Sequence, residues 1–435
     1  MAEILPFRAL HYDPRKIPDL GAVVTQPYDK ISPQMQARYY GLSPYNLVRI
    51  IRGRTLPDDG PANNVYVRAA SDFQAWIQSG VLASEHEPAI YPYHQEYEVP
   101  GQRGLRKERR GFIALLRLED YSARVVHRHE ETLSGPKADR LELLKATRAH
   151  YGQIFMLYSD PAGVVEGLLA APAAEQPWER VTDEYGTRHT AWRTAEPKII
   201  AGVTAAMSNK RLVIADGHHR YETASAYRDA CRANSSDRNA PHEFVMMTLV
   251  NMNSPGLVVL PTHRVVFGVE GFDAEKLTRQ LQEFCELKRT TSSGAGLLAE
   301  LAEMGRGGTA FGVVTAGGRV LARVRADKVD NLLTDVTTLE RQLDVVVLHE
   351  IVLHRILGIS PEAVREQRNV RYFRSADEAV QQVANGANAA FLLNPVPLTV
   401  MRDLCYAGRV MPQKSTDFYP KLLSGLTLDD LDQCF

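Results

Sequence analysis

The chain has 435 residues, 44% of them apolar and 24% charged, with 51 basic and 52 acidic side chains and a net charge of −1. These proportions are those of a soluble globular protein of two or more domains, and the balanced charge excludes a chain-wide basic surface for nucleic acid or an anionic membrane. Four scattered cysteines without a CxxC pattern argue against a disulfide frame or zinc knuckle, and no apolar run approaches membrane-spanning length. We therefore expect a cytoplasmic protein with no nucleic-acid or membrane partner, and leave open whether it forms a homodimer.

Two polar loops near the N-terminus are candidate ligand contacts. Tyr28 and Asp29 fall in a Pro-rich loop shortly before Ser32, whose place ahead of a proline is typical of a helix start. Asn46 falls in a second polar turn, ahead of an expected strand at 47–51. Ordinary turn chemistry explains these loops as well as ligand binding does. We keep Tyr28, Asp29 and Asn46 as candidate substrate-binding residues.

The remainder of the first 270 residues predicts alternating strands and helices. Apolar alternation at 91–99 and an apolar run at 111–118 predict two strands of a hairpin. Helical spacing and stop signals predict helices at 64–79, about 137–149, 164–171 and 198–208, and apolar runs predict buried strands at 153–158, 242–251 and 257–260. This mixture favours a fold that combines helices and sheets.

A histidine–glutamate pair ends a further short strand. His129 and Glu130 follow that strand, and a loop leads from them to the helix at about 137–149. A carboxylate beside a histidine at a strand end is suited to accept a hydroxyl proton, because a neighbouring cation and partial burial decide its pKa. A lone glutamate is more often a surface carboxylate. Glu130 is a candidate base because of its neighbours, and His129 is a candidate substrate contact.

The most informative stretch is 211–224, RLVIADGHHRYETA. It predicts a short buried strand, a turn at Asp216 and Gly217, and a helix that starts at His218 and ends at about residue 232. The first backbone N–H groups of a helix lack intrahelical partners and carry partial positive charge, so they favour phosphate or carboxylate. Gly217 allows the backbone to approach such a ligand closely.

The side chains of this turn have chemistry that suits an anion. Asp216 could hold a divalent cation or a hydroxyl proton, and His218, His219 and Arg220 could donate hydrogen bonds to anionic oxygens. The plainer alternative is an aspartate N-cap followed by solvated histidines. Five consecutive polar or glycine residues after a buried strand favour a binding site over that alternative.

Further candidates lie nearer the C-terminus. His263 and Arg264 follow a buried strand, where a structural role is at least as consistent as a ligand contact. Lys414, Ser415 and Thr416 have the residue types of a phosphate-binding loop. No glycines precede them, which excludes a Walker motif and leaves an anion contact or a packing role.

Seven motifs together resemble one protein family. In chain order they are RALHYDP, QPYDKISP, SPYNLVRI, HEETLSGPKADRL, ADGHHRYETA, PTHR and MPQKSTDFYPKLLSG. On these motifs the chain resembles the family catalogued as domain of unknown function 1015, whose label implies no mechanism. The His-Glu strand end and the Asp-Gly-His-His-Arg helix start resemble, more distantly, the ParB and sulfiredoxin superfamily, especially its ADP-dependent free-serine kinase.

That resemblance implies a fold and a domain organisation. We expect a mixed α+β fold with a ParB/sulfiredoxin-like core at about 122–265, extended by added strands and helices, inside an N-terminal domain of residues 1–268. A C-terminal α/β domain would occupy 269–435 and end in a tail that caps the site. Residues 271–335 predict helices and a Gly-Gly hairpin without evident chemistry.

The same resemblance implies that Glu130 matches a catalytic base and residues 216–220 a phosphate and metal loop. The leading hypothesis is a phosphotransferase that moves a phosphoryl group between ADP or ATP and a hydroxyl substrate such as serine or phosphoserine, with Mg²⁺ held by Asp216. One alternative is a nucleotide-independent phosphatase with His218 or His219 as nucleophile. The other is a non-enzymatic, nucleotide-binding regulator of the ParB type, which the neutral charge disfavours.

Overall fold

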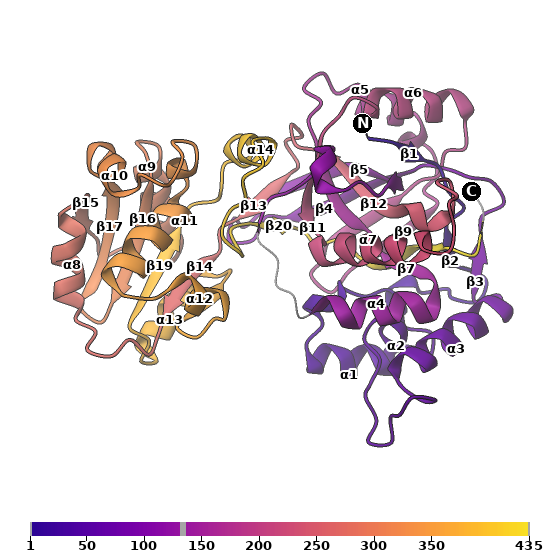
Figure 1. Cartoon of the computed structure of the whole chain (residues 1–435), viewed down its shortest axis with the longest axis horizontal. Helices are drawn as coiled ribbons and strands as arrows, with labels where there is room; N and C mark the ends of the chain where they lie inside the picture. Colours follow the sequence, from indigo (N-terminus) through magenta and orange to yellow (C-terminus); the bar gives the residue numbers. More distant parts are fainter. Residues whose placement is uncertain (1, 131–135, 434–435) are drawn as a thin grey trace. The chain divides into compact units, whose positions relative to one another are not determined.

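The computed structural model describes residues 2–130 and 136–433, and its contacts divide the chain into two compact units (Figure 1). Unit 1 comprises Met1–Arg128, Thr132–Val258 and Pro420–Phe435, and unit 2 comprises His129–Glu131 and Val259–Tyr419. Each unit combines helices with β-sheet, which confirms the expected mixed α+β class. Both units are assembled from more than one stretch of chain, whereas the sequence pointed to a single boundary after residue 268.

The described part of unit 1 contains a large sheet of nine strands. Eight of them follow the order β6-β11-β8-β12-β5-β4-β10-β9, and β1 pairs with β5. Their bounds are β1 Ile4–Leu5, β4 Tyr91–Glu98, β5 Arg106–Arg117, β6 Val126–Arg128, β8 Ile154–Tyr158, β9 Glu179–Thr182, β10 Arg188–Ala191, β11 Leu212–Asp216 and β12 Phe244–Asn251. The neighbours β6 and β11 run parallel, so their carboxyl ends lie at the same edge of the sheet.

The centre of this sheet confirms the predicted strands. β4 and β5 form the expected hairpin, with Tyr91 opposite Ile113. β12 lies between β5 and β8, and all eight of its residues are buried. A largely apolar strand that is covered on both faces is the arrangement that its sequence predicts. Phe112, Met156 and Ile214 belong to one cluster of buried apolar residues in the core of this unit.

A second sheet of unit 1 has the order β3-β2-β21-β7. Its strands are β2 Leu10–Tyr12, β3 Leu82–Ser84, β7 Ala149–Gly152 and β21 Ser424–Asp430. Leu10 pairs with Leu428, and His150 pairs with Asp429. The C-terminal strand β21 therefore joins two strands from the first 152 residues of the chain, and Leu428 is buried with Leu10 in a second core cluster.

The helices of unit 1 follow most of the predicted ranges. They are α1 Pro33–Leu42, α2 Val48–Ile51, α3 Val65–Gln78, α4 Pro136–Thr147, α5 Val164–Leu169, α6 Pro197–Met207 and α7 His218–Arg232. Ser32 accepts a hydrogen bond from Met35 N and is the N-cap expected of it. The strand predicted at 47–51 is wrong, because these residues start the short helix α2. Asn46 accepts from Val48 N, and this local capping outweighs the strand propensity of the apolar run.

Unit 2 is built on a six-stranded sheet in its described part, with the order β15-β17-β16-β19-β14-β18. Its strands are β14 His263–Val266, β15 Cys285–Arg289, β16 Ala310–Thr315, β17 Gly318–Val324, β18 Val370–Phe373 and β19 Ala389–Leu393; β13 Val258–Leu260 and β20 Asp417–Tyr419 lie outside this sheet. Its helices are α8 Ala274–Gln282, α9 Gly294–Gly305, α10 Ala326–Leu332, α11 Asp344–Val347, the π-helix Leu348–Ile356, α12 Pro361–Arg365, α13 Ala376–Ala384 and α14 Leu398–Tyr406. β16 and β17 form the predicted Gly-Gly hairpin, which closes at the pair Thr315 and Gly318.

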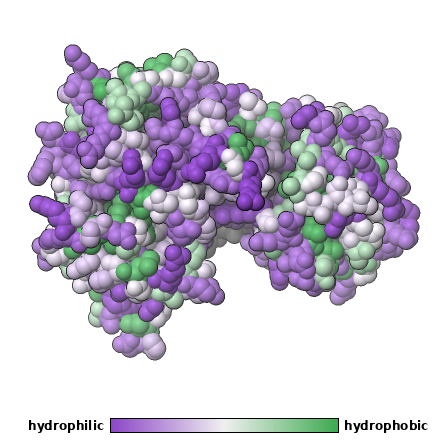
Figure 2. All heavy atoms as spheres, turned by 180° about the vertical axis from the view of Figure 1, so that it is seen from behind, coloured by the Kyte–Doolittle hydropathy of each residue, from purple (hydrophilic) through white to green (hydrophobic). Residues whose placement is uncertain are grey.

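Large apolar side chains are rarely exposed in the described chain. Figure 2 shows polar residues over most of the visible face, with apolar residues in small separate groups. The large apolar side chains that are exposed are Leu42, Leu56, Val67, Leu105, Val164 and Tyr185. Scattered residues of this kind are normal on a protein surface. None of the described helices combines the length and the apolar character needed to cross a membrane.

Candidate functional site

The strand, turn and helix predicted at 212–232 are present in unit 1. β11 ends at Asp216, Gly217 is the N-cap, and α7 begins at His218. Gly217 has no side chain with which to cap the helix. The first backbone N–H groups of α7 are therefore not satisfied by a cap and can bind an anion.

Glycine is required at position 217 for two reasons. Its φ of 93° lies in the left-handed region, which favours glycine. A Cβ here would also lie 3.0 Å from Nε and 3.1 Å from Cζ of Arg220. A larger residue would therefore strain the backbone and push the Arg220 guanidinium away from its place.

Gly217→Ala is expected to destabilise the fold by about 1–2 kcal/mol and to weaken binding of inorganic phosphate by roughly tenfold, because the Arg220 guanidinium is displaced. Gly104→Ala is the matched control, since Gly104 has a φ of 82° and no atom within 4 Å of the added Cβ. Urea unfolding measures the first effect and calorimetric titration the second. Equal phosphate affinities in the two variants would contradict a role for Arg220 in anion binding.

The Asp216 carboxylate is held between two cations. Its Oδ2 accepts a hydrogen bond from Arg220 Nη2 at 3.0 Å, and its Oδ1 lies 3.4 Å from Lys421 Nζ. Burial of this carboxyl opposes its ionisation, but the surrounding positive charge is stronger and holds its pKa well below the ordinary value. That charge comes from Lys421, Arg220, Lys30 and His218. Asp216 is therefore ionised at neutral pH.

The backbone at Pro420 and Lys421 is held by hydrogen bonds from two side chains. Gln95 Nε2 donates to Lys421 O at 2.8 Å, and Arg109 Nη2 donates to Pro420 O at 2.6 Å. Arg109 is buried, with its guanidinium 4.5 Å from the centre of the Phe155 ring. Burial lowers the pKa of Arg109 to about 10, so it stays charged at neutral pH. These contacts fix the backbone from which Lys421 reaches Asp216.

A second arginine and a tyrosine lie near Arg220. The Arg140 guanidinium is 4.4 Å from the centre of the Tyr28 ring. Burial raises the pKa of Tyr28, and the charges of Arg220 and Arg140 partly offset this effect. Tyr28 is therefore within electrostatic reach of both arginines. Arg220 is itself anchored by a hydrogen bond from its Nη1 to Gln153 O at 2.6 Å.

We call Lys30, Arg140, Arg220 and Lys421 the cationic cluster of unit 1. These four residues come from distant segments of the sequence and gather near the start of α7. Basic side chains next to the N–H groups of a helix start are the combination by which proteins bind phosphate. The cluster therefore suits a phosphorylated ligand.

The two histidines of the turn differ in exposure. His218 is 6% exposed, and His219 is half-buried. His218 contributes to the positive charge that acts on Asp216. Its burial restricts the approach of a substrate to the ring, so of the two histidines His219 is the more accessible candidate for a phosphatase nucleophile.

Metal ligands are sparse around Asp216. Within residues 2–130 and 136–433, no group of three or more His, Cys, Asp or Glu side chains is arranged to hold a metal ion. Both oxygens of Asp216 already contact cations. Proteins commonly hold Mg²⁺ through one or two carboxylates together with substrate phosphates. Asp216 fits such a site as a single protein ligand, and the neighbouring cations fit the phosphates.

The other predicted catalytic residue, Glu130, belongs to a cluster in unit 2. Glu130 Oε2 accepts a hydrogen bond from Lys414 N at 3.0 Å, and His129 Nε2 lies 2.7 Å from Thr416 Oγ1. Lys414 has a φ of 58°, an unusual value for lysine, and its carbonyl accepts from Arg264 Nη2 at 3.0 Å. Five of the predicted site residues, distant in sequence, thus meet in one place.

Comparison with known proteins identifies the family. A family model described as "Protein of unknown function (DUF1015)" matches residues 4–346. The chain belongs to the DUF1015 family. No curated protein matches the sequence of this DUF1015 protein.

Solved structures similar to the DUF1015 chain include free serine kinases. Free serine kinase in complex with AMP is 14% identical, with 74% of this chain and 93% of that chain covered and a TM-score of 0.36. A free serine kinase variant in complex with ADP is 13% identical, with 74% of this chain and 94% of that chain covered and a TM-score of 0.37. A conserved hypothetical protein from Pyrococcus furiosus is 13% identical, with 74% of this chain and 97% of that chain covered and a TM-score of 0.35. The likeness to free serine kinase implied by the motifs is found, at a level that carries no conclusion about activity.

Two residues predicted to bind substrate have structural roles in the DUF1015 fold. Asn46 is buried, donates to Ala22 O at 2.8 Å and accepts from Val48 N at 3.0 Å. His263 is buried and accepts at Nδ1 from Leu393 N at 3.2 Å. Burial lowers the pKa of His263 to about 4, so the ring is neutral at pH 7. These polar atoms serve the backbone, and a role of either residue in substrate binding stays a prediction.

Other predicted positions are only partly available to a ligand. Ser415 is buried and its hydroxyl donates to Pro412 O, so it is already engaged. Asp29 is more exposed, and its Oδ2 lies 3.5 Å from Lys30 Nζ. The predicted loop after Glu130 falls on residues 131–135, which lie outside the described residues.

Sequence reasoning missed three members of the cationic cluster. Lys30, Arg140 and Lys421 were not among the predicted site residues, although each stands inside one of the seven motifs on which the resemblance rests. Lys30 and Arg140 also fall within the matched range of residues 4–346, and Lys421 lies beyond it. Those motifs are QPYDKISP, HEETLSGPKADRL and MPQKSTDFYPKLLSG. A basic residue inside each of several family motifs is a signal that could have pointed to a common anion site.

Proposed function

We propose that the protein is a phosphotransferase that moves a phosphoryl group between ADP or ATP and a small hydroxyl substrate such as serine or phosphoserine. The observation that carries this proposal is the cationic cluster beside ionised Asp216, at the uncapped start of α7. Phosphoryl transfer depends mainly on positioning phosphates and neutralising their charge, with little covalent work by the protein. The cluster supplies both contributions.

Asp216 lies next to Arg220 and Lys421, where a phosphate would contact the same two cations. The side chains of Arg220 and Lys421 are 16% and 10% exposed. Charge-assisted hydrogen bonds are stronger in such partly buried places than in open water. A phosphate that binds here competes with the Asp216 carboxylate for Arg220 and Lys421.

The accepting hydroxyl needs a base, and the motif resemblance assigns this role to Glu130. The Glu130 side chain is 19% exposed, and its Oε2 is positioned by Lys414 N. The Arg264 guanidinium and the Glu130 carboxylate also attract each other electrostatically. Glu130 stays the predicted base, and serine stays the substrate that the resemblance implies.

Mg²⁺ is the ion that the proposal expects to accompany the nucleotide. Asp216 is the residue that would hold it, in company with the phosphates. When bound, the ion would neutralise charge on the transferring group. Lys421 and Arg220 would then remain as ligands of the phosphate oxygens.

Thermal unfolding in the presence of AMP, ADP and ATP, each with and without Mg²⁺, tests the proposal. We expect ADP or ATP to raise the melting temperature by about 2–4 °C at saturating concentration. The nucleotide that stabilises the chain is then assayed for interconversion of serine and phosphoserine.

Three outcomes separate the candidate functions. Nucleotide-dependent interconversion supports the phosphotransferase. Hydrolysis of phosphoserine without nucleotide supports the phosphatase, and nucleotide binding without any transfer supports the regulator. Failure of all three nucleotides to stabilise the chain contradicts the proposal.

A further inference from the structure

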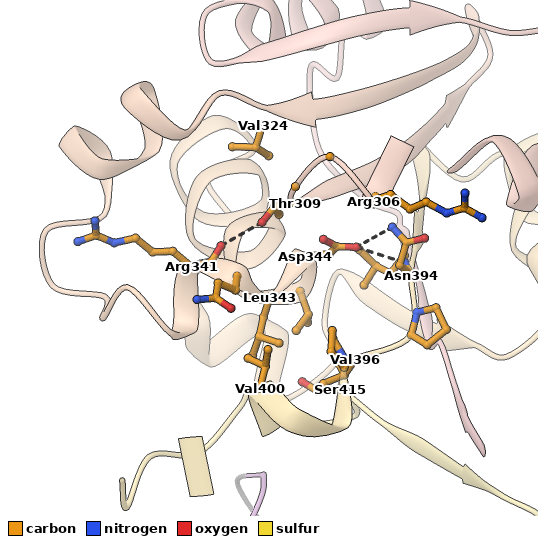
Figure 3. Close-up of a pocket in the computed structure, with 18 of the residues that line it drawn as sticks. Arg306, Thr309, Val324, Arg341, Leu343, Asp344, Asn394, Val396, Val400 and Ser415 are labelled. Atoms are coloured by element: carbon orange, nitrogen blue, oxygen red, sulfur yellow. Dashed lines mark hydrogen bonds between the residues drawn. The ribbon is translucent and has the colours of Figure 1, made fainter. Parts of the chain in front are cut away.

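Unit 2 contains a cavity of about 710 Å³ (Figure 3). Among the predicted phosphate-binding residues Ser415 lines it, and the Ser415 hydroxyl donates to Pro412 O. Cavities of this size are typical of sites for metabolites and drug-sized ligands. The residues that line it come from the turn before β16, the ends of β17 and β19, helices α9, α10, α11 and α14, and neighbouring loops, all between residues 259 and 419. The cavity therefore belongs to unit 2 alone.

Asp344 places a carboxylate in the wall of this cavity. Its Oδ1 accepts from Ala310 N at 3.0 Å, and its Oδ2 accepts from Asn394 Nδ2 at 2.9 Å. Burial raises the pKa of Asp344 to about 6, against the effect of these hydrogen bonds. No described residue forms an ion pair with it. At pH 7.5 the group is thus a partly buried negative charge, and its hydrogen bonds come from neutral amides.

The orientation of this carboxylate is fixed before any ligand arrives. Asn394 Nδ2 also donates to Ala310 O at 3.2 Å, which ties the ends of β16 and β19 together. A Cβ on Gly305 would lie 2.7 Å from the same nitrogen. Glycine at 305 therefore lets the turn after α9 pack directly on Asn394, and Asn394 in turn orients Asp344.

The two arginines at the cavity do not point toward its carboxylate. Figure 3 shows the guanidinium groups of Arg306 and Arg341 directed away from Asp344. Arg306 pairs with Glu303 at 2.8 Å, and Arg341 Nε donates to Val336 O at 2.9 Å. An anionic ligand would consequently meet Asp344 without a cation turned toward it. The charge pattern favours a cationic ligand.

The remaining wall is largely apolar. Val324, Leu343, Val345, Val396 and Val400 line the cavity. We propose that the cavity binds a small organic amine, whose ammonium group pairs with Asp344 and whose apolar body packs against these side chains. An ammonium donates hydrogen bonds to a carboxylate that already holds its geometry, and the apolar part removes the surrounding wall from water.

Three probes of one shape test this proposal with the full chain at pH 7.5: benzylamine, benzyl alcohol and benzoate. Calorimetric titration and ligand-observed NMR measure their binding. We expect benzylamine to bind at least about tenfold more tightly than the alcohol, since an ion pair in a partly buried site contributes this factor, and benzoate not to bind. Equal binding of amine and alcohol, preference for benzoate, or no binding of benzylamine would overturn the proposal.

Two variants locate the binding in this cavity. Asp344→Asn removes the charge, and Ala302→Trp, at an exposed lining residue of α9, adds a bulky side chain to the wall of the cavity. Both are expected to lose at least about tenfold in benzylamine affinity. Asp377→Asn, at an exposed carboxylate of α13, is the matched control and should bind as the wild type does. If Asp344→Asn fails to fold, the loss in Ala302→Trp still decides, and unchanged binding in that variant would contradict the assignment.

Discussion

Lys421→Met is expected to weaken the binding of a nucleotide by about 10- to 100-fold, because a charge-assisted hydrogen bond contributes roughly 1.5–3 kcal/mol. The substitution removes the ammonium that faces Asp216 and keeps an apolar stem of similar length. Hydrogen bonds to the backbone at 420 and 421 are retained, since Arg109 and Gln95 donate to main-chain carbonyls. Calorimetric titration with ADP, with and without Mg²⁺, measures the effect.

Lys210→Met is the matched control for this experiment. Lys210 forms the same kind of pair in unit 1, with its Nζ 3.3 Å from Asp160 Oδ1, where Asp160 caps the start of α5. This variant loses a lysine–aspartate pair and should keep its nucleotide affinity. A loss of equal size in both variants would mean that the effect of Lys421 is one of general stability. An affinity within about twofold of wild type in Lys421→Met would remove Lys421 from the site.

Asp216→Asn is expected to have two opposite effects. In EDTA, inorganic phosphate should bind roughly tenfold more tightly, because the carboxylate that competes for Arg220 and Lys421 is gone. The increment that Mg²⁺ adds to nucleotide binding should disappear, because the single carboxylate ligand is lost. Titrations of wild type and variant with phosphate and with ADP, in EDTA and in Mg²⁺, separate the two effects.

The same variant has a characteristic dependence of stability on pH. The pKa of Asp216 is lower in the folded chain than in the unfolded chain, so the ionised group stabilises the fold above about pH 4 and loses this contribution as the pH falls below that value. The difference in unfolding free energy between wild type and Asp216→Asn should be constant from pH 8 to about pH 5 and should shrink below about pH 4. Asp160→Asn serves as control for phosphate binding. Weaker phosphate binding in Asp216→Asn in EDTA would contradict the competition between carboxylate and phosphate.

Local sequence patterns were sufficient to predict the turn at residues 216–220. An apolar strand, an Asp-Gly turn and a helix start are all set by neighbouring residues, and β11 and α7 have nearly the expected bounds. The basic partners of that turn could not be predicted in this way. Lys30, Arg140 and Lys421 reach it through pairings of distant strands and packing of distant helices, which spacing along the chain does not encode.

Two of the predicted substrate contacts, Asn46 and His263, form hydrogen bonds with the backbone for a common physical reason. Asn46 and His263 are polar residues next to apolar runs, a pattern that fits a ligand contact and a buried hydrogen bond equally well. Which of the two applies depends on whether the neighbouring backbone groups find partners elsewhere. At residue 46 the start of α2 needed an acceptor, and at residue 263 the backbone N–H of Leu393 did.

The position of β21 in the second sheet of unit 1 affects how the protein is made. The ribosome synthesises β21 after all of unit 2, yet this strand joins β2 to β7, which leave the ribosome far earlier. During translation, the edges of β2 and β7 that later pair with β21 stay unpaired until unit 2 has been synthesised. Uncovered strand edges can pair with other chains, so the nascent protein is most prone to aggregation in this interval and should benefit from a chaperone that holds it until synthesis ends.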